Sequence, residues 1–98
     1  MSVIRHVIVS GRVQGVGYRA WLADQAIARG LEGWVRNRRD GTVEAVFAGE
    51  GDVLGAMIDD CRRGPPLARV EAVDARPGTA DDLDVNKSRV QFAMLPTV

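Results

Sequence analysis

The chain has 98 residues, enough for one hydrophobic core, and we expect residues 1–98 to form a single domain. It carries 13 lysines and arginines against 13 aspartates and glutamates, so its net charge of zero gives no general attraction to nucleic acid or to an anionic membrane. Charged residues and glycines interrupt every apolar stretch, and the single cysteine excludes an intramolecular disulfide. We therefore expect a soluble cytoplasmic protein whose specificity for any anion comes from a local site.

The first third of the chain predicts a strand, a glycine-rich turn and a helix. Residues 3–13 are rich in β-branched side chains, which predicts a strand buried on both faces at the centre of a sheet. From Tyr18 to Arg29 the apolar residues recur with the period of a helix, and Gly30 is expected to be its C-cap. The residues expected on its buried face are Tyr18, Leu22, Ala23, Ala26 and Ile27.

The middle of the chain predicts a hairpin and a second helix. Residues 31–37 and 42–48 are extended segments, and the pair Asp40-Gly41 between them supplies the positive φ angles of a tight turn. Asp52 is the expected N-cap of the second helix, which stops before the Gly-Pro-Pro at residues 64–66. Its apolar stripe consists of Val53, Leu54, Met57, Ile58 and Cys61. The cysteine is therefore expected to pack in the core rather than to act as a nucleophile.

The last third predicts two strands separated by a polar loop. Residues 68–75 and 89–94 are the strands, the latter with Val90, Phe92 and Met94 on one face, and residues 76–88 are the loop. The order is strand, helix, strand, strand, helix, strand, with room for one further short strand. Two right-handed crossovers in this order give an α+β fold, the ferredoxin-like α/β sandwich (βαββαβ), with an antiparallel sheet and both helices on one face.

The turn between the first strand and the first helix has the features of an anion site. Residues 11–19 contain three glycines, which allow successive backbone N–H groups to point toward one place. The helix that begins near Tyr18 adds free N–H groups and a partial positive charge. Arg19 adds a planar guanidinium suited to bidentate contact with phosphate. Each feature alone is usually structural, but together they predict a phosphate site.

The same residues carry a resemblance to a known family. Residues 11–19, in the pattern Gly-x-Val-Gln-Gly-Val-x-Tyr-Arg, resemble the phosphate-loop signature of the acylphosphatases. Residues 33–37 (Gly-Trp-Val-Arg-Asn) and 40–43 (Asp-Gly-Thr-Val) resemble the second signature of that family. The resemblance spans nearly the whole chain, and the fold of the family is the one predicted above from the order of the elements.

The resemblance implies hydrolysis of the mixed anhydride of an acyl phosphate, which gives a carboxylate and inorganic phosphate. It implies that Arg19 binds the phosphoryl group and that Asn37 orients the attacking water. The implied phosphate-binding residues are Gly15, Val16, Gly17, Tyr18 and Arg19. No metal and no cofactor are expected, and the partners are a small acyl phosphate and inorganic phosphate, with the chain acting as a monomer. Residues 95–98 extend past the last strand, and the sequence leaves open which group restrains Arg19.

Other functions fit parts of the sequence. A non-catalytic anion-binding module would keep the fold and the cradle without chemistry, but the presence of both Arg19 and Asn37 favours an enzyme. RNA binding on the sheet ranks last, because aromatic residues are few and the net charge is zero. Carbamoyl phosphate is an alternative substrate, and the physiological acyl phosphate is not fixed by the sequence.

Three polar or aromatic residues near these motifs have ordinary structural interpretations. His6 lies within a strand without a second histidine or cysteine nearby, so a structural role is expected. Arg36, next to Asn37, is explained equally well as part of a solvated turn, and it has at most a steering role for an anionic substrate. Trp34 is expected to pack in the core, with a contribution to the pocket lining as the alternative.

Overall fold

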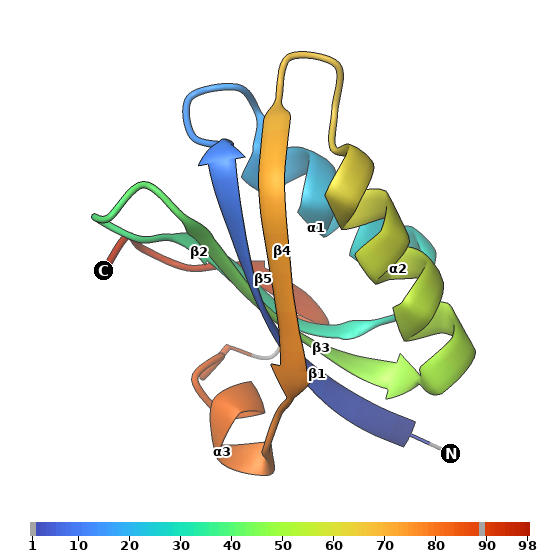
Figure 1. The fold of residues 1–98 in the computed structure, drawn as a ribbon. Coiled ribbons are helices and arrows are strands. Elements are labelled where there is room, and N and C mark those ends of the chain that lie inside the picture. Colours follow the sequence, from blue (N-terminus) through green and yellow to red (C-terminus); the bar gives the residue numbers. More distant parts are fainter. Residues whose placement is uncertain (1, 89) are drawn as a thin grey trace.

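A computed structural model describes residues 2–88 and 90–98 (Figure 1). The elements are β1 Ser2–Arg12, α1 Tyr18–Ala28, β2 Glu32–Asn37, β3 Val43–Glu50, α2 Gly51–Arg63, β4 Arg69–Pro77, α3 Ala80–Leu83 and β5 Phe92–Met94. The strands form a sheet in the order β4-β1-β3-β2-β5. The neighbours β4 and β1, β1 and β3, and β3 and β2 are antiparallel, whereas β2 and β5 are parallel.

The predicted ferredoxin-like α+β fold is confirmed, with two corrections to the sheet. Figure 1 shows α1 and α2 together on one face, as the order of the elements predicts. The middle strand is β3 rather than β1, because residues 43–48 of β3 are all buried, whereas β1 buries Val7 and Val9 between half-buried neighbours. The sheet is not antiparallel throughout: after β4 the chain crosses to the opposite edge and returns there as β5, parallel to β2.

The first helix ends one residue earlier than predicted. Arg29 is the C-cap, and Gly30 follows it with a φ of 71°. The N–H of Gly30 donates to the carbonyl of Ile27, and the next N–H along the chain donates to the carbonyl of Ala26, both at 3.0 Å. These paired bonds are the Schellman ending, which needs a left-handed residue directly after the cap. Of the face predicted to be buried, Ile27 is the exception, with half of its surface exposed.

The second helix begins slightly earlier than predicted. Its N-cap is Glu50 rather than Asp52. Asp52 lies in the first turn, where its carboxylate accepts a hydrogen bond from the N–H of Val53 (3.0 Å) and where the helix dipole favours a negative charge. The predicted apolar stripe faces the sheet: Leu54, Met57 and Cys61 are buried, and Val53 and Ile58 pack against them.

The last part of the chain differs most from the prediction. The predicted polar loop 76–88 contains the one-turn helix α3. Thr79 and Asp82 form its capping box, with bonds of 2.9 and 3.2 Å between each side chain and the other residue's N–H. The last strand is shorter than predicted. Phe92 is buried, whereas Val90 and Met94 are more than half exposed, and Arg89 lies outside the described residues.

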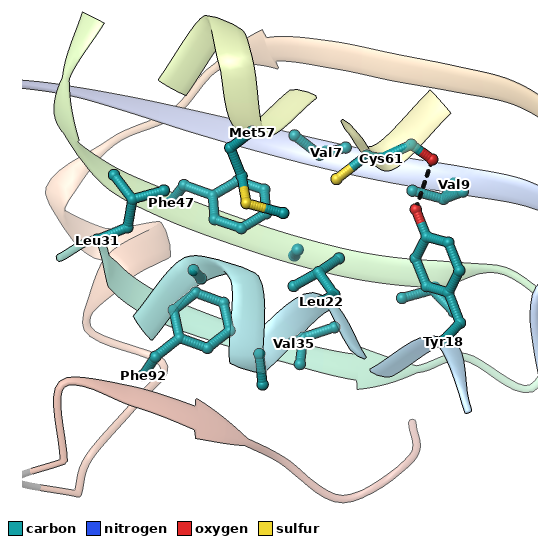
Figure 2. Close-up of a cluster of buried hydrophobic side chains, with 14 of the residues drawn as sticks. Val7, Val9, Tyr18, Leu22, Leu31, Val35, Phe47, Met57, Cys61 and Phe92 are labelled. Atoms are coloured by element: carbon teal, nitrogen blue, oxygen red, sulfur yellow. Dashed lines mark hydrogen bonds between the residues drawn. The ribbon is translucent and has the colours of Figure 1, made fainter. Parts of the chain in front are cut away.

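The main core lies between the two long helices and the sheet, and Figure 2 shows its centre. The rings of Phe47 and Phe92 stack with centroids 5.7 Å apart, which joins the middle strand to the edge strand β5. Cys61 is buried there as predicted, and burial raises the pKa of its thiol to about 12. At neutral pH the thiol is therefore protonated and inert, in agreement with a packing role.

The opposite face of the sheet holds a second, smaller cluster and an ion-pair network. Trp34 is buried there beside Val46, and its indole N–H donates to the carbonyl of Asp82 at the α3 turn (2.8 Å). On the same face, Arg36 Nε donates to Glu44 Oε1 (2.7 Å), and Nε2 of His6 lies 2.7 Å from Glu44 Oε2. The network uses both carboxylate oxygens of Glu44, so this nearly buried acid is well satisfied.

Replacing Glu44 by glutamine is expected to lower the free energy of unfolding at neutral pH by about 1–3 kcal/mol, because hydrogen bonds to a charged acceptor are lost. Burial by itself raises the pKa of Glu44, but the hydrogen bonds from His6 and Arg36 outweigh it, and the pKa lies below its ordinary value of 4.5. The charged carboxylate thus stabilises the folded chain above that value, and this contribution is lost as the pH falls through the folded-state pKa.

Denaturant titrations of wild type and Glu44→Gln at several pH values measure this difference. The gap in unfolding free energy should be full near neutrality and should close in acid. Glu32→Gln is the matched control, because the side chain of Glu32 lies exposed on β2 and makes no hydrogen bond or ion pair with any described residue. If the difference in unfolding free energy between the two proteins stayed the same in acid, the stabilisation would not come from a charged Glu44.

Candidate active site

A small hollow lies where the end of β1, the start of α1 and the ends of β2 and β5 meet. Its volume is about 180 Å³, and its lining consists of Val13, Gln14, Gly15, Gly17, Tyr18, Arg19, Ala20, Asn37 and Met94. The structure thus brings Arg19 and Asn37, predicted from separate motifs, to the same hollow. Of the five predicted phosphate-binding residues, Val16 is the one outside the lining, because its side chain packs against the main core.

Two glycines of the loop that lines the hollow have a left-handed backbone. Gly15 has a φ of 73° and Gly17 a φ of 80°, both in the left-handed region that glycine adopts at little cost. Gly17 is the N-cap of α1 and offers no side chain to bond the first helical N–H groups. Because the first N–H groups of a helix have no partner within the helix, the start of α1 presents donors and a partial positive charge to the hollow.

The side chain of Tyr18 does not point into the hollow. It is buried in the core, where its hydroxyl donates to the carbonyl oxygen of Cys61 at 2.7 Å (Figure 2). That carbonyl belongs to the last turn of α2, where carbonyls have no helical partner. Burial is the main cause that raises the pKa of Tyr18 far above its usual range, so the phenol stays protonated. Tyr18 therefore contributes backbone to the hollow and anchors α1 by its side chain.

Arg19 stands in the first turn of α1 with a half-buried side chain. Among the described residues, its guanidinium makes no hydrogen bond and no ion pair, so the structure identifies no carboxylate that restrains it. The hydrogen-bond donors of this side chain are therefore available to an anion in the hollow.

Asn37 is the last residue of β2, and the C-terminal tail holds its backbone. The carbonyl of Asn37 accepts from the N–H of Val98 (3.2 Å), and a main-chain oxygen of Val98 accepts from the N–H of Arg39 (2.7 Å). The side-chain oxygen Oδ1 of Asn37 is buried and has no hydrogen-bond partner among the described residues. A buried acceptor left unpaired costs on the order of 1–3 kcal/mol, so this atom marks a place for an external donor such as water.

Gln14 ties the glycine loop to the hairpin that carries Asn37. Its side-chain amide donates to the carbonyls of Arg38 (2.7 Å) and Thr42 (2.8 Å), on either side of the β2–β3 turn. The sequence interpretation included Gln14 in the motif but assigned it no role. Its place in the motif was the available signal, but its partners became known only from the folded structure. Ala20 and Met94 were also missed, because only the fold brings them to the hollow.

The residues with structural interpretations lie elsewhere. Arg36 points to the opposite face of the sheet, pairs with Glu44 and lies over the ring of Trp34 at 4.6 Å. Neither Arg36 nor Trp34 lines the hollow, so the core-packing interpretation of Trp34 is the correct one. His6 contacts Glu44 on that same face.

Within residues 2–88 and 90–98, no three His, Cys, Asp or Glu side chains gather as a metal site. None of the helices in this part of the chain has the length and apolar character needed to cross a membrane.

Comparison with known proteins identifies chains of similar sequence and fold. The sequence profile of the acylphosphatase family matches residues 5–92. An acylphosphatase of Rhodopseudomonas palustris (strain BisB18) is 53% identical over 97 residues, which cover 99% of this chain and 98% of that protein. The solved acylphosphatase structure from Coxiella burnetii has a TM-score of 0.83 and 32% identity, covering 96% of this chain and 93% of that one. The one from Bacillus subtilis has a TM-score of 0.82 and 30% identity, covering 97% and 99%.

The chain belongs to the acylphosphatase family. Relatives named acylphosphatase are 53–56% identical to it over almost the full length of both chains. The chain is therefore an enzyme that hydrolyses acyl phosphates. The activity implied by the two sequence motifs is thereby confirmed, and the enzyme is favoured over the non-catalytic module and the RNA-binding sheet.

Gln14→Met is expected to lower kcat/KM for acetyl phosphate by roughly 10- to 100-fold, since a shift of the loop by a fraction of an ångström misplaces two reacting groups. Methionine retains the volume of glutamine but removes both donors to the hairpin turn. Steady-state kinetics checks the effect, with circular dichroism to show that the variant is folded. Gln25→Met is the control, because the amide of Gln25, on α1, bonds no described residue. Unchanged kcat/KM in Gln14→Met would refute a positioning role for Gln14.

Proposed function

We propose that the hollow is the catalytic site, in which Arg19 and the loop 15–19 hold the phosphoryl group and Asn37 orients the attacking water. One observation supports this most directly. Arg19 and Asn37 line the same small hollow, and neither the guanidinium of Arg19 nor Oδ1 of Asn37 has a partner among the described residues. An anion beside the arginine and a water on the amide oxygen would satisfy both groups at once.

The proposed phosphate contacts come mainly from the backbone. The N–H groups of Gly15, Val16, Gly17, Tyr18 and Arg19 form the cradle, and the side chain of Arg19 closes it. The Val16 side chain packs into the core, but this does not prevent its N–H from taking part. Donors held in place before the substrate arrives need no reorganisation as charge shifts over the phosphoryl oxygens, which is the main source of catalysis in phosphoryl transfer.

The proposed reaction is an in-line displacement. Water held by Asn37 attacks phosphorus, the bond from phosphorus to the acyl oxygen breaks, and the carboxylate leaves with the bonding electron pair. The conjugate acid of that leaving group has a pKa of roughly 4–5, like a glutamate side chain, so no general acid is needed at neutral pH. A phosphate oxygen of the substrate accepts the proton of the water. The amide of Asn37 orients the water and is not a base.

The proposal includes no metal and no cofactor, because Arg19 and the start of α1 supply positive charge at the phosphate. It also takes residues 1–98 as one domain and the chain as a cytoplasmic monomer. The length of the chain supports one domain, and a single buried cysteine, which can form no intramolecular disulfide, fits a reducing compartment. Light scattering on a size-exclusion column measures the oligomeric state directly.

Asn37→Ala is expected to reduce kcat for benzoyl phosphate by roughly 100- to 1000-fold, the cost of losing one preorganised polar group. Inorganic phosphate should still inhibit competitively with a nearly unchanged inhibition constant, because Asn37 orients water rather than phosphate. Arg19→Ala should lose both turnover and phosphate inhibition. Release of phosphate and carboxylate, followed with EDTA present, measures all three proteins.

Arg62→Ala is the control for the arginine, since Arg62 is exposed on the last turn of α2 and pairs with no described residue. If Asn37→Ala turned over substrate at the wild-type rate, the amide of Asn37 would not orient the attacking water. Activity that disappears on chelation and returns with a divalent cation would overturn the metal-free mechanism.

A further inference from the structure

A second, apolar groove continues from the hollow along the outer side of α1. It runs between residues 20–27 of the helix and residues 88 and 90–95, which include β5, and its volume is about 700 Å³. The hollow itself, at about 180 Å³, has room for little more than a phosphate and a water. The remainder of any acyl phosphate bound there has to lie outside the hollow.

The groove gathers large apolar side chains that the core does not use. Ile27 is 50% exposed, Val90 57% and Met94 56%, and all three line this one groove. The periodicity of α1 placed Ile27 on the buried face, and the sequence placed Val90 and Met94 on the same face of a strand as the buried Phe92. Single exposed apolar residues are ordinary, but several gathered along one concave surface are typical of a binding site.

The groove and the hollow share a wall. Ala20 and Met94 line both, whereas Asn37 lines the hollow alone. In an in-line displacement the leaving oxygen stands opposite the attacking water, so the acyl group points away from Asn37. A small residue and a flexible one on the shared wall leave that route open. The combined site is cationic at the Arg19 end and mainly apolar along α1, where Asp24 is the one charged residue among the described lining. This arrangement fits an amphipathic molecule.

We propose that this groove binds the acyl group of the substrate, and that the preferred substrates are acyl phosphates with an extended apolar acyl group, rather than acetyl or carbamoyl phosphate. The inference rests on the proposed function, because phosphate in the hollow fixes where the acyl chain begins. Each methylene buried in the groove should strengthen binding about three- to fourfold until the groove is filled.

A competing route leaves the hollow past Gly15. A separate depression there is lined by Arg12 and Arg69, which stand opposite each other on β1 and β4 and pair with no described acid. Cross-strand cations at this exit would suit an acyl group with a second negative charge. The two routes therefore predict opposite preferences, one for apolar and one for anionic acyl groups.

Binding and turnover are measured separately. Calorimetry with methyl-, butyl- and hexylphosphonate gives affinity without chemistry, and hydrolysis of acetyl, butyryl, hexanoyl and succinyl phosphate gives KM and kcat. Wild type should bind hexylphosphonate at least tenfold more tightly than methylphosphonate. KM should fall with acyl length while kcat changes little, because the carboxylate leaving groups are similar.

Ile27→Asp and the milder Ile27→Gln should remove most of this dependence on chain length while leaving acetyl phosphate kinetics and phosphate inhibition unchanged. Val85→Asp is the matched control, because Val85 is an exposed valine that does not line the groove. Equal affinity for all the phosphonates, or a chain-length effect that survives both Ile27 variants, would overturn the proposal.

Two further outcomes are decisive. A preference for succinyl phosphate over butyryl phosphate would assign the acyl group to the exit past Gly15. A change of mass in solution on Ile27→Asp, with the chain-length effect intact, would make the groove a contact between two copies. Failure of the proposed function is distinguished from failure of the groove proposal by a different measurement. If the proposed function is wrong, Asn37→Ala hydrolyses acetyl phosphate at the wild-type rate, whatever the phosphonate affinities are.

Discussion

The hydrogen bond from the buried hydroxyl of Tyr18 to the carbonyl of Cys61 fixes the start of α1 against the end of α2. It occupies a carbonyl at a helix C-terminus that no helical N–H can reach, and it places the first free N–H groups of α1 at the hollow. At the other end of α1, Arg29 pairs with Asp60 of α2. The first helix is thus held at both ends, and the position of Arg19 follows from the core rather than from contacts of its own.

The two faces of the sheet differ in function, because successive side chains of a strand point to opposite faces. Along β2, Val35 and Asn37 face the helices, and Trp34 and Arg36 face the other way. The ion-pair network around Glu44 therefore stabilises the sheet without placing a carboxylate beside the phosphate hollow. A negative charge at the hollow would oppose the anion that its free donors favour, and the alternation keeps the two apart.

The sequence predicted the fold and the glycine loop from local signals, whereas Asn37 was assigned to the site through the family resemblance. Glycines directly before a helix indicate an anion-binding turn whatever the rest of the fold. The position of Asn37 at the end of a strand followed from the hairpin pattern. Contacts between distant segments were not predictable in the same way. The partners of Gln14, the exposure of Ile27 and the parallel pairing of β5 each depend on how elements far apart in the chain are packed. The helix α3, by contrast, has a local signal in the sequence, the capping box of Thr79 and Asp82.

The backbone pairing of Val98 with Asn37 and Arg39 has a practical consequence for handling the protein. An affinity tag or a fluorescent fusion attached after Val98 would pull on the strand end that carries the amide of Asn37. The start of β1 emerges away from that end of the sheet, as Figure 1 shows. Purification handles and surface-immobilisation linkers for kinetic work therefore belong at the N-terminus.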